Sequence, residues 1–297
     1  MSRRGWVLFV ALCLIWGLPY LMIRVAVREV DPATLVLLRT APVAILLVPW
    51  AAVTGRLSPL RGHLKWLIAY SALEFGIPWF LMGSAEKHLT SSLTALLVAS
   101  VPMLAALMYR FAHVHERLGA RRSTGLIVGM LGVVGLVGLS VGGSTWVGIA
   151  EMVPAVIGYT IGPLIIATKL AHMPGPGVVG ASVGLVGLAY LPYGVTHLPS
   201  HVSINVIGAI AVLAFVCTAM GFLTLFALIL EVGPTRSTVV TYVNPAVAIA
   251  LGVTLLGEPI TNGMIIGFPM IILGSILATS QRRESSENPI LEVDSAK

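Results

Sequence analysis

Glu74 is the residue of this chain best placed to do chemistry, because it stands in the middle of the apolar stretch 64–83. About nine residues separate it from either end, which is roughly 13 Å at helical rise. A charge at that depth costs several kcal/mol unless it is paired or wet. Trp66, Tyr70, Glu74 and Pro78 recur every four residues and so share one helix face. We expect Glu74 to face a polar cavity; a protonated carboxyl bonded to a neighbouring helix is the structural alternative.

Two more charged residues lie within apolar stretches and are candidates for binding a charged solute or a coupling ion. Arg39 lies about seven residues inside the stretch 33–53. Its long stem can reach the outer headgroups, which favours an anchoring role over a ligand role. Glu151 enters the stretch 146–168 near its outer end and can reach water.

Glycine and proline predict helix breaks inside four apolar stretches. Gly17 and Pro19 interrupt the first stretch, and Gly162 and Pro163 interrupt the sixth. Proline removes a backbone donor, and freed backbone groups survive in lipid only beside protein or a water-filled cavity. Matching breaks in two halves of a chain indicate a binding site at the membrane midplane. Two further break candidates occupy matching places in the fourth and ninth stretches: Pro102 and Pro245.

Aromatic and polar side chains from several stretches are expected to wall such a site. The candidates are Trp16, Tyr20, Tyr70, Glu74, Trp79, Tyr159, Tyr242 and Asn244. Aromatic walls with one carboxylate suit a cationic or zwitterionic solute. Glu74 can alternatively carry a coupling proton.

The elements that position these residues are apolar helices. Apolar residues make up 57% of the 297-residue chain and charged residues 10%, too few charges to cover a water-soluble protein. The stretches are about 20 residues long, enough to cross a bilayer as helices, and they lack the alternation of barrel strands. We therefore predict an all-α integral membrane protein. Its ten expected spans are 6–26, 33–53, 64–83, 90–111, 123–141, 146–168, 177–197, 203–229, 235–256 and 261–280.

Charge placement predicts the orientation of these spans. With the N-terminus inside, the inner connections carry fourteen Lys and Arg residues and the outer ones three. Positive residues stay on the cytoplasmic side, so both termini are expected in the cytoplasm, with the protein in the cell membrane. The tail 281–297 is polar and lacks periodicity, which favours disorder.

The second half of the chain repeats the first. Ser100-Val101-Pro102 and Val243-Asn244-Pro245 place their prolines 143 residues apart, and Glu116 and Glu258 lie 142 apart. A unit of five crossings starts its second copy on the opposite side of the membrane. The sequence thus predicts two inverted five-helix repeats, 1–144 and 145–280, around a central cavity. Inverted repeats are typical of transporters that work by alternating access.

Other classes of protein find less support. No Gly-x-Ser-x-Gly motif occurs, and the histidines lie at interfaces, so an enzyme is not expected. His113-Val114-His115-Glu116 lacks the spacing of a metal site, and we expect neither metal nor cofactor. The basic residues sit in short connections, which favours membrane orientation over nucleic-acid binding.

Glycine spacing predicts close helix packing within the fifth and tenth spans. Gly125, Gly129 and Gly132 recur at intervals of four and three, and Gly267 and Gly274 lie seven residues apart. Small residues at such intervals let helix backbones approach. We interpret them as scaffold contacts, with a homodimer interface as the lesser alternative.

Several motifs resemble one known family. Ser91-Ser92-Leu93-Thr94-Ala95-Leu96-Leu97, followed by Pro102 and Glu116-Arg117-Leu118, is similar to the fourth helix of an EamA-type repeat. The run from Thr235 to Gly257-Glu258-Pro259-Ile260 resembles its second copy, and Trp16-Gly17 and Arg39 also fit. The resemblance covers about residues 6–280 and implies the drug/metabolite transporter superfamily. It further implies that helices five and ten lie at the periphery of a central cavity.

These observations predict a secondary transporter, acting as an exporter or exchanger of small polar or amphipathic metabolites. Its expected partners are the solute and membrane lipid. A passive channel and, less favoured, a polytopic membrane enzyme are the alternatives.

Overall fold

The computed structural model describes residues 2–112, 120–138, 145–233, 237 and 239–279, which are helical and without strands. Helices suit this composition, since they satisfy their backbone hydrogen bonds internally where lipid offers none. The expected loop His113–Glu116 and the expected disordered tail 281–297 lie outside the described residues.

The first repeat contains five spans, two of them built from several pieces. The first two spans are α1 (Arg3–Ala26) and α2 (Pro32–Val53). The third runs through η1 (Ser58–His63), α3 (Leu64–Tyr70), η2 (Ser71–Gly76) and α4 (Ile77–Ala85). The fourth comprises α5 (Ser91–Val98) and α6 (Val101–Ala112), and the fifth is α7 (Ala120–Gly138).

The second repeat has the same plan. Its spans are α8 (Thr145–Lys169), α9 (Gly175–Thr196), the run of α10 (Ile204–Ala211), η3 (Val212–Met220) and α11 (Gly221–Val232), then α13 (Val240–Leu256) and α14 (Asn262–Thr279). Seven helical runs in the described residues are long and apolar enough to cross a membrane, and three are shorter. Together they account for the ten predicted spans.

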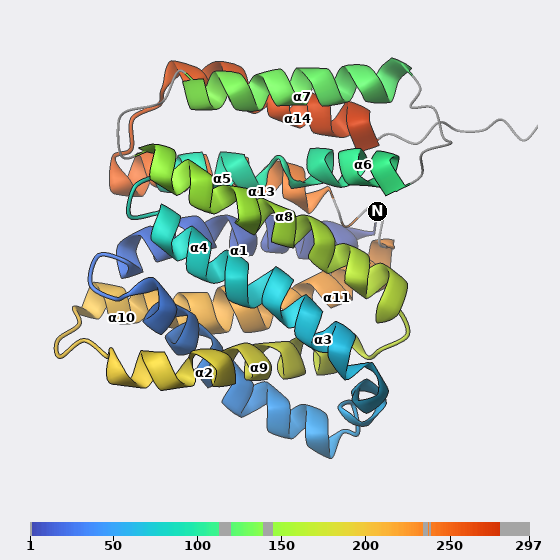
Figure 1. The fold of residues 1–297 in the computed structure, drawn as a ribbon, viewed down its shortest axis with the longest axis vertical. Coiled ribbons are helices and arrows are strands. Elements are labelled where there is room, and N and C mark those ends of the chain that lie inside the picture. Colours follow the sequence, from blue (N-terminus) through green and yellow to red (C-terminus); the bar gives the residue numbers. More distant parts are fainter. Residues whose placement is uncertain (1, 113–119, 139–144, 234–236, 238, 280–297) are drawn as a thin grey trace, which may run out of the picture.

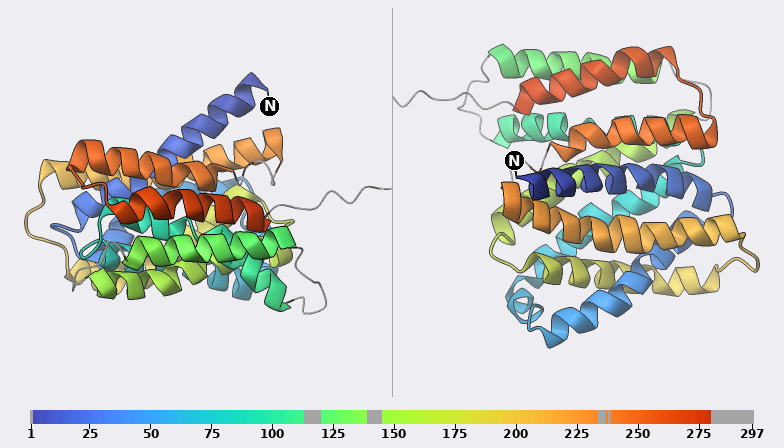
Figure 2. Two further views of the ribbon diagram at one scale, coloured as in Figure 1. Left: turned by 90° about the horizontal axis from the view of Figure 1, so that it is seen from above. Right: turned by 180° about the vertical axis from the view of Figure 1, so that it is seen from behind.

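The helices lie side by side, and at the two edges of the bundle corresponding helices of the two repeats pair with each other (Figures 1 and 2). At one edge α7 packs on α14, and at the opposite edge α2 packs on α9. Between these edges α1 packs on α13 and α4 packs on α8. The peripheral position of α7 and α14 agrees with the sequence prediction. α1 begins and α14 ends at the same end of the bundle (Figure 1).

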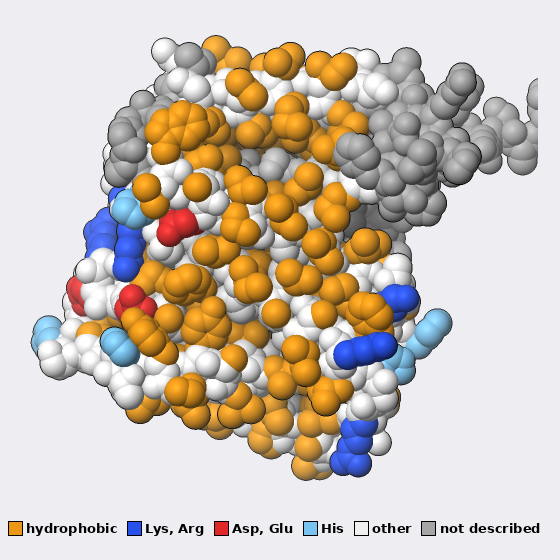
Figure 3. Space-filling model, viewed as in Figure 1, with side chains coloured by type: hydrophobic (Ala, Val, Ile, Leu, Met, Phe, Trp, Pro, Cys, Tyr) orange, Lys and Arg blue, Asp and Glu red, His pale blue; other side chains and the backbone are white. Residues whose placement is uncertain are grey.

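The surface is apolar along the helices and charged at their ends (Figure 3). Large side chains such as Ile45 and Leu230 are 71% and 88% exposed. In water such a surface would drive aggregation, whereas lipid chains solvate it. The exposed apolar band and its charged rims therefore identify the direction in which the bilayer is crossed.

Most of the predicted proline breaks are wrong. The α1 helix continues through Gly17 and Pro19, α8 through Gly162 and Pro163, and α13 through Pro245. A proline φ near −65° is compatible with a helix, so each proline loses one hydrogen bond without ending its helix. Gly17 instead allows close packing, because a Cβ there would lie 2.4 Å from Val247.

The fourth span does break beside its proline. The α5 helix ends at Val98 and α6 starts at Val101, which places Pro102 in the first turn of α6. A first-turn residue has no intrahelical acceptor for its N–H, so proline is tolerated there. Pro102 thus lies directly after the interruption between α5 and α6.

Candidate functional site

The centre of the bundle is shaped by two π-helical segments that the sequence patterns did not predict. η2 lies in the third span and η3 in the eighth, which are equivalent helices of the two repeats. A π-helical turn widens the helix, leaves carbonyls poorly matched and often marks a functional site. η2 carries Glu74 and η3 carries Thr218. The two segments therefore bring polar groups from both repeats into the apolar interior.

Arg39 is buried inside the protein and does not reach the outer headgroups, so the expected headgroup anchor is corrected. Arg39 is only 5% exposed. The Nε group donates to Thr218 Oγ1 at 3.0 Å, and the guanidinium lies 3.5 Å from the ring centroid of Trp79. The Thr218 hydroxyl in turn donates to the carbonyl of Leu213 at 2.8 Å. Contacts from α4 and η3 thus hold the guanidinium within the bundle.

Glu74 points its carboxyl group at α8. Its Oε2 atom is buried and has no hydrogen-bond partner. Gly162 of α8 makes room for it, since a Cβ at Gly162 would stand 2.1 Å from Oε2. The sixth-span glycine predicted as a helix break therefore serves to accommodate the third-span carboxyl group. This contact places Glu74 against protein at membrane depth.

Tyr159 of α8 is close to both Arg39 and Glu74. Its hydroxyl interacts electrostatically with Arg39, Tyr20 and Glu74 and approaches the Trp79 side chain. Arg39 and Glu74 nevertheless do not pair. In the described part of the chain the ion pairs are Arg4–Glu231 and Lys87–Asp31, which lie at the ends of the helix bundle. A guanidinium and a carboxyl group are thus both close to one tyrosine without forming an ion pair.

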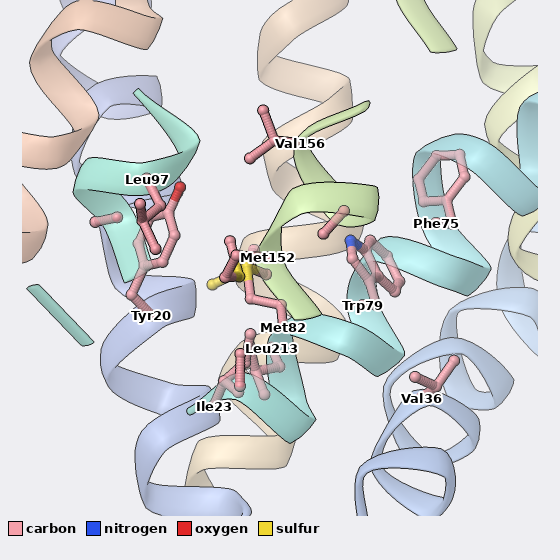
Figure 4. Close-up of a cluster of buried hydrophobic side chains, with 14 of the residues drawn as sticks. Tyr20, Ile23, Val36, Phe75, Trp79, Met82, Leu97, Met152, Val156 and Leu213 are labelled. Carbon is pink, nitrogen blue, oxygen red and sulfur yellow. The ribbon is translucent and has the colours of Figure 1, made fainter. Parts of the chain in front are cut away.

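A chain of aromatic contacts borders this polar centre. The Trp16 ring lies 5.6 Å from Phe222, Phe222 lies 5.3 Å from Phe75, and Phe75 lies 5.4 Å from Tyr70 and 5.1 Å from Trp79. Figure 4 shows Phe75 and Trp79 within the same buried cluster as Tyr20 of α1. Three of these four contacts are edge-on and the Phe75–Phe222 contact is tilted, arrangements that aromatic pairs favour. Phe75, fully buried, was missed by the sequence analysis because an apolar residue in an apolar helix carries no signal.

Three predicted site residues lie elsewhere. Tyr242 directs its hydroxyl toward the carbonyl of Ser275 in α14, at 3.5 Å. Asn244, with its amide oriented to satisfy its neighbours, donates to the Cys13 carbonyl of α1 and so joins two helices. Glu151 accepts a hydrogen bond from Ser84 at 2.6 Å near the beginning of α8. Tyr242 and Asn244 thus make contacts between helices, and their place in a binding site stays a prediction.

At the end of the bundle away from the N-terminus, Glu258 joins the two repeats. Its Oε1 atom accepts from the N–H and hydroxyl of Ser91 at 2.8 and 2.9 Å. Its Oε2 atom accepts from the N–H and hydroxyl of Ser92 at 3.0 and 2.6 Å. A carboxylate at a helix N-terminus is favoured by the unpaired N–H groups and the helix dipole. This clamp holds the end of α13 to the beginning of α5.

Tyr20, Tyr70, Phe75 and Trp79 pack in one buried cluster at the centre of the bundle, with Tyr159 half-buried against it. An apolar cavity of about 290 Å³ lies to one side, lined by α5, α6, α7 and α8 residues such as Met103 and Val156. Among the described residues, no three His, Cys, Asp or Glu side chains gather to hold a metal ion.

The fold and its buried charges define a class: a multi-pass helical membrane protein with pseudo-symmetric halves and a polar centre. A model of the EamA-like transporter family matches residues 3–138 and again residues 146–280. The chain therefore belongs to the EamA-like transporter family and is a membrane transporter.

Individual proteins with similar sequences carry compatible names. The "Probable amino-acid metabolite efflux pump" of Salmonella typhimurium is 24% identical over 288 residues, covering 92% of this chain and 94% of that protein. The "Uncharacterized inner membrane transporter YedA" of Escherichia coli K12 is 26% identical over 277 residues, covering 91% and 88%. One solved crystal structure superposes with a TM-score of 0.66 at 19% identity, covering 94% of this chain and 98% of that one. That likeness concerns the fold.

Proposed function

We propose that this protein is a secondary transporter of small zwitterionic metabolites, working by alternating access as an exporter or exchanger. One observation carries the proposal. The Arg39 guanidinium and the Glu74 carboxyl group lie inside the bundle, both close to Tyr159, and neither has a charged partner in the described residues. A solute with a carboxylate and an ammonium group would satisfy both.

In this proposal Arg39 and Glu74 have different roles. The Nε atom of Arg39 is engaged by Thr218, and one face of the guanidinium is covered by Trp79. The two Nη groups can then donate in parallel to a carboxylate, the bidentate arrangement that arginine favours. Glu74 Oε2 lacks a donor, and an ammonium group can supply one. The aromatic rings around Phe75 would contact the solute's apolar part.

The pseudo-symmetry of the bundle supports the alternating-access mechanism. Pairing of equivalent helices, α2 with α9 and α7 with α14, allows the repeats to exchange their conformations with little change in contact area. One repeat then closes one end while the other opens the opposite end. The name of the Salmonella relative, an amino-acid metabolite efflux pump, is consistent with a zwitterionic solute. The proposal includes no catalytic residue and assigns the protein to the cell membrane, with lipid as its surroundings.

The test uses purified protein in liposomes and counterflow of a panel of radiolabelled amino acids. For each amino acid that is exchanged, the decarboxylated amine and the deaminated acid are used as competitors. Arg39→Gln should weaken competition by the acid at least tenfold and leave the amine unaffected. Glu74→Gln should do the reverse, since each variant removes one charge of a charge-assisted hydrogen bond.

The control is Glu29→Gln, which removes an exposed carboxylate that binds Ser203 N outside the spans. In this variant the amine and the acid should compete as strongly as they do in the wild type. Equal loss of both competitors in both charge variants would contradict the assigned roles. Absence of counterflow by every amino acid would contradict the solute class.

A further inference from the structure

Glu86 is a buried carboxyl group that the proposed transport site does not use. It follows directly after α4, the last piece of the third span. The residue is 0% exposed, and neither Oε1 nor Oε2 has a hydrogen-bond partner. Buried polar atoms are almost always partnered, so two unpartnered oxygens on one carboxyl group require an explanation.

The groups around Glu86 do not neutralise a negative charge. From α1, Arg24 donates to the backbone carbonyl of Glu86 and leaves the carboxyl oxygens unbonded. Beyond α13, the Glu258 carboxylate adds a second negative charge, and its oxygens are already engaged by Ser91 and Ser92. The hydroxyl of Tyr20, also on α1, interacts with Glu86 electrostatically.

Burial sets the protonation state. Desolvation is the largest influence and raises the pKa of Glu86 well above its usual range; the Arg24 charge opposes this, and Glu258 adds to it. An unpaired buried carboxylate costs far more than a buried neutral carboxyl. The closed arrangement therefore holds Glu86 with its proton.

We propose that Glu86 is a proton-binding site whose protonation is coupled to closure of this end of the transporter, an inference that rests on the proposed alternating access. When the Glu258 clamp releases α5, water reaches Glu86, and the carboxyl group gives its proton to that water. When the end closes, the carboxylate takes a proton back. Each closure at this end thus binds one proton, and acid on that side favours the closed form.

Linkage gives the sign and size of the effect. A carboxyl group whose pKa is raised by folding contributes stability that is fully present below its ordinary pKa. That stability is lost as pH rises toward the raised value. Within that window the closed form should lose a factor of ten in its equilibrium constant for each pH unit. Glu86→Gln, which imitates the protonated group, should lose this dependence.

The first experiment needs no solute and so is independent of the transport assignment. The melting temperature of detergent-solubilised wild type should fall as the pH rises from about 5 to 9. Glu86→Gln should melt as high as acid-treated wild type, with a shallower pH profile than the wild type. Infrared spectra at neutral pH should show protonated-carboxyl absorption that decreases in Glu86→Gln. Glu29→Gln should keep the wild-type slope, because hydrogen bonds from Ser203 lower the pKa of that exposed carboxyl group.

The second experiment measures counterflow in liposomes at equal pH on both sides. Acid should slow wild-type exchange, whereas Glu86→Gln should be slow at every pH. A wild-type pH slope in Glu86→Gln, or an unchanged infrared band, would overturn the proton site. Equal destabilisation of Glu86→Gln and Arg24→Gln at neutral pH would also overturn it, because that pattern indicates an ionised, paired Glu86. Absence of counterflow in the wild type would instead count against the transport proposal.

Discussion

At the scale of single residues, the closeness of Glu74 to α8 is the contact most sensitive to substitution. The third-span carboxyl group fits only because position 162 carries no Cβ. A methyl group there would stand well inside van der Waals distance of Oε2. The side chain of Glu74 would have to rotate away from Tyr159 and Arg39.

We therefore predict that Gly162→Ala lowers amino-acid counterflow at least tenfold while the protein still folds. Displacing a charged ligand by about 1 Å is enough to cause a hundredfold loss in a preorganised site. The matched control is Gly208→Ala in α10, where no atom lies within 4 Å of the added Cβ. Unchanged counterflow in Gly162→Ala would show that Glu74 takes no part in transport.

The depth of a residue in the membrane was predictable from the sequence, but the direction in which its side chain points was not. The position of Glu74 in a long apolar run is sufficient to show that exposing its carboxyl group to lipid would be costly. In the structure its Oε2 atom is buried within the protein. The path of the Arg39 stem depends on Trp79 and Thr218, which come from helices distant in sequence. Glu86 was overlooked, because Glu86-Lys87-His88 reads as a solvated connection and nothing local indicates that other helices cover it.

At the scale of elements, the fifth and tenth spans form the tightest helix pair through backbone approach. A Cβ at Gly274 would lie 2.3 Å from Gly129 N, and one at Gly125 would lie 2.5 Å from Ala278 N. The glycine pattern thus serves contact between the two repeats within one chain. This use of the glycine faces supports the scaffold interpretation over the homodimer alternative.

We predict that Gly274→Val destabilises the protein by about 1 to 3 kcal/mol, the usual cost of overpacking a close contact. Because α7 and α14 lie at the edge of the bundle, exchange per folded molecule should stay near the wild-type rate. Thermal unfolding and counterflow on the same preparation measure both quantities. Gly135→Ala, in open space on α7, should change neither. A transport loss greater than the loss of folded protein would place this pair in the mechanism.

The number of helices and their ends could be predicted from the lengths of the apolar stretches. The π-helical turns inside the helices could not. Predicted span ends lie within a few residues of those observed, as α8 at Thr145–Lys169 against 146–168 illustrates. Proline was a poor guide to interruption, since α1 and α8 run through their prolines. The π-helical turns of η2 and η3 have no proline signal. Packing between spans, rather than local sequence, determines where those turns form.

At the scale of the whole molecule, the repeat and the charge distribution give a testable orientation. We predict that the connection containing Lys87 faces the outside and the connection containing Arg61 faces the cytoplasm, from the bias of basic residues toward the inside. In a background with Cys13 and Cys217 replaced by Ala, Lys87→Cys should react with an impermeant thiol reagent on intact cells. Arg61→Cys should react only after the membrane is permeabilised. The opposite pattern would reverse the predicted topology and place Glu86 on the cytoplasmic side.

The clamp between Glu258 and α5 has a consequence for how the protein is made. Ser91 and Ser92 leave the ribosome long before Glu258, some 166 residues later. During synthesis the start of α5 therefore lacks its final acceptor until the end of α13 has been made. The packing of the first repeat is complete only once the second repeat is in place. Formation of the folded protein is thus a joint event of both halves.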